Sequence, residues 1–153
     1  MTDSLSLRER AGVRAPPAPL PVVIDTNIVL DVFVFSDAAA IPLRQALAAG
    51  TLDWLATQAM RDELARVLAY PKIVTRLSFY KLTAEDVLAA FDQQARLVDV
   101  PAKSSLNCSD PDDQKFIDLA VAHHALLLSK DRAVLSMAKR LLRQSVQVLP
   151  AMK

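Results

Sequence analysis

The chain has 153 residues, a formal net charge of +1 and 52% hydrophobic residues, which suits one domain with a buried core and argues against two. No apolar run approaches the roughly 18 residues that a membrane-spanning helix needs, so we expect no membrane contact. Cys108 is the only cysteine, which excludes an internal disulfide and gives no sign of an oxidising compartment. Nothing at the N-terminus indicates a signal peptide, and we expect a cytoplasmic protein.

Residues 1–20 differ in composition from the rest of the chain. Scattered charges are followed by a proline-rich piece around residues 15–21, which can neither continue a helix nor pair inside a sheet. We therefore expect a flexible tail over residues 1–20 and a single domain over residues 21–150.

An apolar run that ends at a carboxylate opens the predicted domain. Val22, Val23 and Ile24 are β-branched and do not alternate with polar residues, which is typical of an interior strand of a parallel sheet. Asp25 follows directly, and in open α/β sheets ligands bind outside the carboxyl ends of the strands. Taken alone, the residues from Asp25 to Asn27 would equally suit a turn or a helix cap.

The predicted elements alternate along the rest of the chain, after an apolar stretch over 28–35 that only Asp31 interrupts. Turn, capping and periodicity signals predict helices over 38–49, 58–69, part of 71–82, 83–94, 111–123 and 132–143, and strands over 52–56, 96–100, 125–129 and 146–149. Gly50 is expected to close the first of these helices, and Thr83 and Asp86 are spaced as a capping box. The alternation indicates an α/β fold with parallel strands and right-handed crossovers.

Three aspartates open the helix predicted over 111–123. Asp110, before Pro111, suits a helix N-cap, and capping alone would explain an acid there. Asp113 lies instead near the middle of the helix face that packs on the sheet. A buried carboxylate is costly unless something pairs with it, and a metal ion is one such partner. Asp112 lies at the flank of the same face.

Two further acids complete a candidate site. Glu63 lies at the edge of the buried stripe of its helix, where its carboxylate can reach a cleft. Asp131 follows the strand over 125–129, although it also suits an N-cap for the next helix. With Asp25 and Asp113 they are expected to meet at one edge of the sheet, where four carboxylates repel unless cations neutralise them. Oxygen ligands alone favour Mg²⁺ or Mn²⁺, and such a site suits two-metal hydrolysis of phosphodiesters.

Four pieces of the sequence together carry a family resemblance. They are Val-Val-Ile-Asp25-Thr26-Asn27, then Glu63-Leu64 in a helix that ends near Pro71-Lys72, then Asp110-Pro-Asp-Asp113-Gln-Lys-Phe-Ile-Asp-Leu-Ala120, then Leu-Leu-Leu-Ser129-Lys-Asp131. In this order and spacing, over about residues 21–150, the chain resembles the PIN-domain nucleases. It is most similar to their stand-alone bacterial branch, described as the toxin of a toxin–antitoxin pair.

The resemblance implies a three-layer α/β/α sandwich around a central parallel sheet of about five strands, and cleavage of RNA with Mg²⁺ or Mn²⁺, as two ions. By position it implies an acidic quartet that binds metal and catalyses, formed by Asp25, Glu63, Asp113 and Asp131. The polar residues that are implied to orient this quartet are Asn27 and Ser129. Asp110 and Asp112 are alternatives to Asp113 as the metal ligand in their segment. The resemblance also implies an antitoxin protein as partner and a homodimer. Basic residues that could guide the RNA backbone are Lys72, Arg76, Lys130 and Arg132.

Two other classes of protein stay open. A PIN fold can serve as a catalytically silent interaction module, although all four acids are present in this chain. A phosphoacceptor receiver domain also gathers acids at the carboxyl edge of its sheet. That class needs an acceptor aspartate at the end of a central strand, before an open loop. Asp99 of the strand predicted over 96–100 is instead followed by Val-Pro, which argues against this class.

Overall fold

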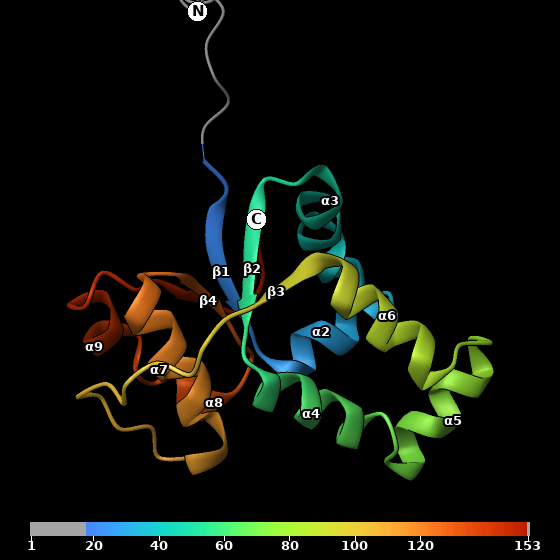
Figure 1. Cartoon of the computed structure of the whole chain (residues 1–153). Coiled ribbons are helices and arrows are strands. Elements are labelled where there is room, and N and C mark those ends of the chain that lie inside the picture. Colours follow the sequence, from blue (N-terminus) through green and yellow to red (C-terminus); the bar gives the residue numbers. More distant parts are fainter. Residues whose placement is uncertain (1–17, 153) are drawn as a thin grey trace, which may run out of the picture.

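A computed structural model describes residues 18–152 of the chain, and the tail expected over residues 1–20 lies almost wholly outside this range. The described residues form one sheet of five parallel strands, flanked on both sides by helices (Figure 1). The strands are β1 Leu20–Ile24, β2 Leu52–Ala56, β3 Ala95–Leu97, β4 Leu126–Leu128 and β5 Val148–Leu149. The predicted α/β fold with about five parallel strands is therefore confirmed.

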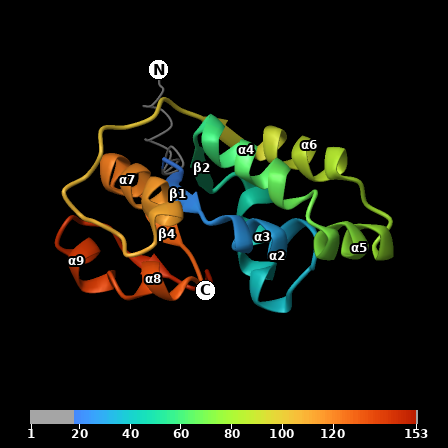
Figure 2. The same cartoon turned by 90° about the horizontal axis from the view of Figure 1, so that it is seen from below.

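The helices form two layers, one on each face of the sheet (Figure 2). The helices that lie between β1 and β3 in the chain cover one face: α2 Thr26–Phe33, η1 Ala38–Ala40, α3 Ile41–Ala49, α4 Gln58–Val67, α5 Pro71–Phe79 and α6 Ala84–Gln94. The helices that follow β3 cover the other: η2 Pro111–Asp113, α7 Gln114–His123, α8 Arg132–Leu135 and α9 Ala138–Leu142. This division gives the three layers of an α/β/α sandwich.

The order of the strands explains why the helices divide in this way. The sheet runs β3-β2-β1-β4-β5, so the chain adds strands on one side of β1, and then crosses over to add β4 and β5 on the other side. Right-handed crossovers in opposite directions place their helices on opposite faces. The reversal falls between β1 and β4, where Val22 pairs with Leu126 and the amide of Asp25 donates to the carbonyl of Leu128 at 2.9 Å. Ligands bind at such a switch point in open α/β sheets.

The core lies on both faces of this sheet. Val22, Val23 and Leu127 are fully buried, as expected for strands that are covered on both sides. On the face of α2 and α6, Trp54 stacks on Phe33 with ring centroids 6.0 Å apart and meets the edge of Phe91 at 5.0 Å. Within residues 18–152, no single helix is long and apolar enough to cross a membrane; only α2 together with η1 and α3, across a bend of 101°, passes by length and composition.

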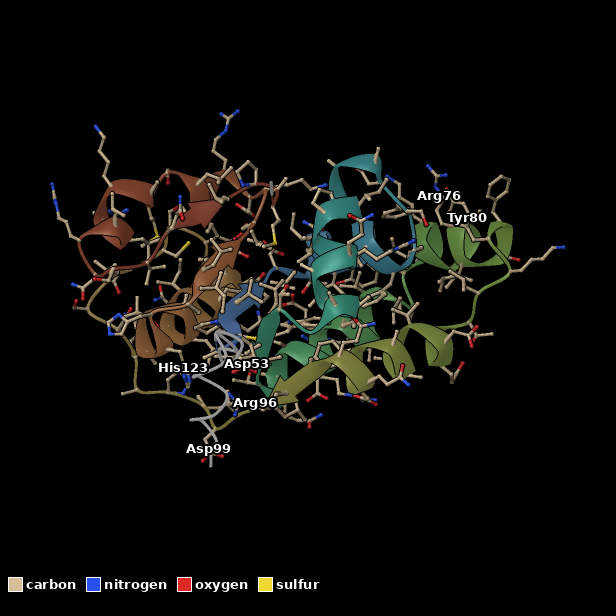
Figure 3. The ribbon with its side chains drawn as sticks, turned by 90° about the horizontal axis from the view of Figure 1, so that it is seen from above. Asp53, Arg76, Tyr80, Arg96, Asp99 and His123 are labelled. Atoms are coloured by element: carbon tan, nitrogen blue, oxygen red, sulfur yellow. The ribbon has the colours of Figure 1, made fainter. Side chains whose placement is uncertain are left out.

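Several local signals are confirmed. Gly50 ends α3 in the left-handed conformation, at φ 74°, and Thr83 and Asp86 form both bonds of the capping box of α6. At the edge of the sheet, Arg96 of β3 reaches across to Asp53 of β2, and both residues lie on the side that Figure 3 displays.

Other local predictions need correction. The helix predicted over 132–143 is two short helices, α8 and α9, and where α8 ends the hydroxyl of Ser136 donates to the carbonyl of Ala133. Strand β3 begins one residue earlier than predicted and ends at Leu97. The apolar stretch after Asp25 is a helix, α2, and the helix predicted from 111 begins with the 3₁₀ turn η2.

Candidate active site

Asp25 stands at the carboxyl end of β1, beside the switch point of the sheet. Its side chain is buried, at 4% exposure, and accepts hydrogen bonds from the Ser129 hydroxyl at 2.7 Å and from the Asn27 amide at 3.1 Å. Burial raises the pKa of Asp25 above its usual range, and the nearby charges of Asp131 and Glu63 add to this, although the two hydrogen bonds act against it. The carboxylate is thus held in one orientation, and within residues 18–152 no cation forms an ion pair with it.

Ser129 connects two of the predicted acids. This fully buried hydroxyl donates to Asp25 and accepts from the backbone amide of Asp131 at 3.0 Å, so it couples the ends of β1 and β4. Asp131 in turn accepts from the amide of Ala133 at 2.9 Å and is the N-cap of α8. One oxygen of Asp131 therefore caps a helix, as its sequence position suggested, while its carboxylate also belongs to the cluster described next.

Asp113 is the most strongly perturbed acid of the group. It is the last residue of η2 and is 8% exposed, and within residues 18–152 its Oδ2 is a buried oxygen without a hydrogen-bond partner. Carboxylate oxygens of Asp110, Asp113 and Asp131 lie within 4.8 Å of one another. Burial, the contact with Asp131 and the charge of Asp25 raise the pKa of Asp113 to about 7.

The two aspartates that precede Asp113 differ from each other. Asp110 accepts from the amide of Asp112 at 3.0 Å and so caps η2, as its sequence position predicted, yet it also stands in the three-carboxylate cluster. Asp112 is exposed and lines the hollow in front of the acids. Of the two alternatives raised by the sequence, Asp110 is the one that lies beside Asp113.

Glu63 reaches the site from α4, on the opposite layer of the sandwich. Its carboxylate accepts from the hydroxyl of Thr26 and forms an ion pair with Lys115 at 2.6 Å. Thr26 and Lys115 were missed from the sequence, although each stands within two residues of a predicted acid, Thr26 after Asp25 and Lys115 after Asp113. The charge of the Glu63 carboxylate is therefore neutralised in this structure by Lys115, which belongs to the facing layer.

The acids share one hollow of about 400 Å³ that opens at the carboxyl edge of the sheet. Asp25, Glu63, Asp113 and Asp131 all line it, so the fold brings the predicted quartet together, whereas the tight cluster contains Asp110 in place of Asp25 and Glu63. Asn27 lines the hollow too, but the bond it makes to Asp25 comes from its backbone, and its side chain is exposed.

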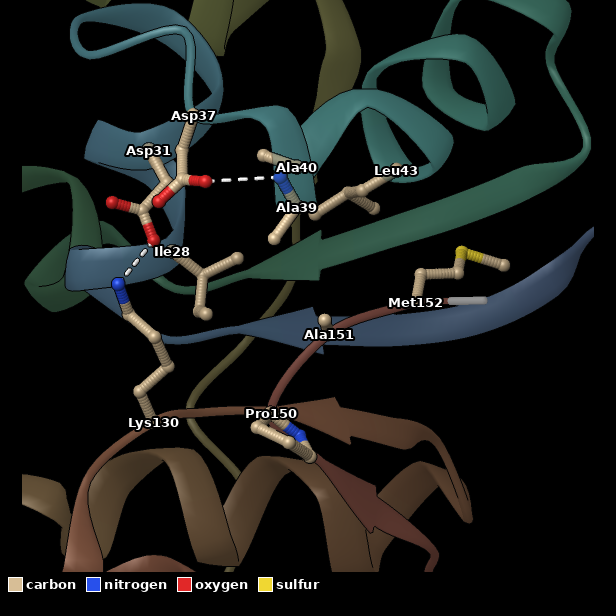
Figure 4. A pocket seen from close by; sticks show the side chains of 10 residues that line it. All are labelled: Ile28, Asp31, Asp37, Ala39, Ala40, Leu43, Lys130, Pro150, Ala151 and Met152. Carbon is tan, nitrogen blue, oxygen red and sulfur yellow. Dashed lines mark hydrogen bonds and ion pairs between the residues drawn. The ribbon is translucent and has the colours of Figure 1, made fainter.

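An ion pair between a buried acid and an exposed lysine stands behind the loop that carries Ser129 and Asp131. Asp31, the one acid in the apolar stretch of α2, is 9% exposed and pairs with Lys130 (Figure 4). Because Lys130 lies between Ser129 and Asp131 in the chain, the pair ties this loop to α2. The isolated acid in an apolar run was a visible signal in the sequence, but its partner was not.

The donor set fits a hard divalent cation. The cluster offers carboxylate oxygens, the ligands that Mg²⁺ and Mn²⁺ prefer, and no histidine or cysteine belongs to it. A buried carboxylate oxygen without a partner is costly, and a cation would supply the missing partner of Asp113 Oδ2. Asp110, Asp113 and Asp131 are placed to hold one ion, and Asp25 and Glu63 lie at the border of the same hollow.

The sequence of the chain also matches a known protein family. The sequence profile of a PIN-domain family matches residues 21–133, which is most of the chain. The chain belongs to the PIN-domain family. PIN domains are in general metal-dependent nucleases and act on nucleic acid, and this chain has a cluster of three acids that could bind a metal ion. No sequence among the curated proteins matches the chain.

Proposed function

We propose that the protein is an endoribonuclease that hydrolyses RNA phosphodiester bonds with Mg²⁺ or Mn²⁺. The observation that carries the proposal is the cluster of three carboxylates within 4.8 Å at the switch point of the sheet, with the partnerless buried oxygen of Asp113 among them. A cluster of this kind destabilises the metal-free fold, which indicates that it serves a purpose other than stability.

Two ions are proposed, as in the sequence-based assignment. Asp25, Glu63 and Asp113 would hold the first, and Asp131 would help to hold the second or position the attacking water, with Asp110 beside Asp131 as a further ligand and Asp112 at the rim. The chemistry that such a pair supplies is activation of water and stabilisation of charge on the attacking and leaving oxygens. In-line attack leaves a 5′-phosphate and a 3′-hydroxyl.

The chain's own residues prepare this site. Ser129 fixes the orientation of Asp25 and the position of Asp131 at once, because its hydroxyl bonds to both residues. Lys115 holds Glu63 toward the hollow across the gap between α4 and α7. Asp25 and Asp113, whose raised pKa values reflect burial, gain most from a bound cation, since it favours their charged forms.

We extend the proposal to the biological role implied by the resemblance: the toxin of a toxin–antitoxin pair, acting as a cytoplasmic homodimer and restrained by an antitoxin protein. Induced expression tests this role. Wild type should arrest growth, Asp25→Asn should not, and equal growth of both strains would remove the toxin assignment while leaving the nuclease in place.

A gel assay of end-labelled RNA tests the nuclease itself. Purified wild type is incubated with Mg²⁺ or Mn²⁺, beside EDTA, Asp25→Asn and the matched surface variant Asp53→Asn. Cleavage should require both the metal and Asp25, while Asp53→Asn cleaves as wild type does. If wild type and Asp25→Asn are equally active, or equally silent across varied RNAs, the nuclease proposal fails, and silence of both favours the interaction module.

A further inference from the structure

The acidic hollow does not end at the acids. Asn27, Val67 and Tyr70 also line a second hollow of about 510 Å³, with Leu30, Pro71, Lys72 and Ile73. Lys72 and Ile73 continue into a third hollow of about 560 Å³, with Phe35, Thr75 and Arg76. The second and third hollows, which we name the flank groove, therefore run from the acids along α2 and the start of α5.

The flank groove differs in character from the acidic hollow. Its lining is largely apolar, its charged residues are Lys72 and Arg76, and no acid from the described part of the chain lines it. Among residues 18–152, neither cation has a carboxylate partner within ion-pair distance; Arg76 instead lies over the ring of Phe35, 5.7 Å from its centroid. Arg76 projects from the outer side of α5 in Figure 3. The groove therefore attracts anions.

An exposed aromatic ring lies where the acidic hollow meets the flank groove. Tyr70 is 55% exposed and borders both the acidic hollow and the flank groove. It is the N-cap of α5, and its carbonyl accepts from the amides of Ile73 at 2.9 Å and Val74 at 2.8 Å. Because Pro71 follows, the backbone of Tyr70 is held in place. The ring is thus presented at a defined point of the groove, although it contributes little to the core.

We propose that the flank groove binds a single-stranded stretch of RNA next to the scissile phosphate, with one base stacked on Tyr70 and the following phosphates beside Lys72 and Arg76. This inference rests on the proposed nuclease function. A base offers its face to an aromatic ring only when it is unpaired, so the arrangement selects single strands. Lys72 and Arg76, which have no carboxylate partner among residues 18–152, complement the negative charge of phosphates. The flank groove also joins the acidic hollow, where the proposed cleavage of a phosphodiester takes place.

Binding measured without cleavage tests the role of Tyr70. Full-length protein in EDTA is titrated against a fluorescent unstructured RNA and a fully paired hairpin, with anisotropy as the readout. Tyr70→Ala should weaken binding of the single strand roughly 5- to 150-fold, the range for loss of one base–aromatic stack. Hairpin binding should hardly change. Tyr70→Trp should keep the affinity, and so should Phe79→Ala, which removes a ring of 74% exposure from the same helix but outside the groove.

The two cations are tested by the salt dependence of binding. Each phosphate of a single strand that a protein neutralises adds about 0.7 to the steepness of the plot of log K against log salt. The double variant Lys72→Ala/Arg76→Ala should therefore show a shallower slope than wild type. The matched double variant Lys139→Ala/Arg140→Ala, on α9 at the other end of the molecule, should keep the wild-type slope.

The outcomes separate this inference from the nuclease proposal. If wild type cleaves RNA but Tyr70→Ala binds the single strand as wild type does, the proposed RNA binding in the flank groove is overturned while the nuclease proposal stands. The groove would then have another occupant, such as a segment of a partner protein. Loss of single-strand affinity in Tyr70→Ala, combined with absence of cleavage by wild type, overturns the nuclease and supports the groove as a binding site. Equal loss of single-strand and hairpin binding in Tyr70→Ala contradicts the stacking.

Discussion

Two sets of carboxylates in this protein have opposite surroundings. Asp53, on the outer part of β2, receives two hydrogen bonds from Arg96 at 3.0 and 2.7 Å, and this contact lowers its pKa (Figure 3). Asp25 and Asp113, at the carboxyl edge of the same sheet, have no cation at hydrogen-bonding distance within the described chain, and burial raises their pKa values. Within the described chain, the fold therefore neutralises one set and leaves the other without a cationic partner.

The difference distinguishes structural acids from acids available to a ligand. A fixed guanidinium satisfies both oxygens of Asp53, and Arg61 does the same for Asp92 at 2.7 Å. Either carboxylate would have to lose its arginine before it could bind a metal, and Glu63 would likewise have to release Lys115. Asp113 has an oxygen to offer, and replacing it removes a ligand without breaking an ion pair. The comparison therefore predicts large effects on function at one set and small effects at the other.

The largest expected effect is on cleavage. Loss of a hydrogen-bonding group behind a metal ligand commonly costs 10- to 100-fold, so loss of a ligand should cost more. We expect Asp113→Asn to lower kcat/KM for RNA by more than about 100-fold. Asp53→Asn should stay close to wild type. Initial rates of cleavage of a fluorescent RNA measure both variants. Comparable losses in the two would contradict the distinction between arginine-paired acids and acids that are available to a metal.

The pH dependence of stability comes next. In EDTA, Asp113 has a pKa of about 7 in the folded protein, against about 3.9 in an unfolded chain. Between these values the folded state binds more protons than the unfolded state, so the free energy of unfolding falls as pH rises from about 4 to 7. The loss through Asp113 is at most about 4 kcal/mol.

Asp113→Asn should be more stable than wild type above that pH window and gain little near its lower end, because its amide does not titrate. Denaturation in urea at both ends of the window measures the difference. Asp53→Asn provides the contrast: a lowered pKa stabilises the folded protein at neutral pH and loses this contribution as pH falls. A gain for Asp113→Asn that is independent of pH would contradict the assigned titration.

Ser129→Ala should have an intermediate effect. The variant removes the hydroxyl that holds both Asp25 and the amide of Asp131, while both carboxylates stay in place. We expect a loss of about 10- to 100-fold in Mn²⁺ affinity, and Ser129→Thr, which keeps the hydroxyl, should recover part of it. Wild-type affinity in Ser129→Ala would show that this hydrogen bond does not organise the site.

Arg96→Ala should have the smallest effect. The side chain of Arg96 is 61% exposed and that of Asp53 30%, and solvent screens such pairs strongly. Thermal stability should change little, and RNA cleavage and metal binding should not change. A marked loss of activity in Arg96→Ala would mean that the surface pair supports the site at a distance.

Features with a local cause could be predicted from the sequence. The strand from Val22 to Ile24 is marked by β-branched residues and by the acid that follows, and the ends of α3 and α6 depend on Gly50 and on the capping box. The alternation of strands and helices then placed Asp25 and Asp131 at one edge, because the carboxyl ends of parallel strands meet there.

Features that depend on packing between distant segments could not be predicted. The pairs of Glu63 with Lys115 and of Asp31 with Lys130 join residues far apart in the chain, and an ion pair leaves no periodic pattern in either segment. The apolar stretch that forms α2 is buried almost all round, so its sequence lacks the broad polar face that marks a surface helix. The close approach of Asp110 to Asp113 depends on the 3₁₀ turn between them.

Isothermal titration of Mn²⁺ tests the central claim most directly, namely that the acids at the switch point form a metal site. Wild type, Asp113→Asn and Asp53→Asn are titrated under the same conditions. We predict binding to wild type and to Asp53→Asn with equal affinity, and a large loss in Asp113→Asn. Binding to Asp113→Asn that matches wild type would remove Asp113 from the site and contradict the account.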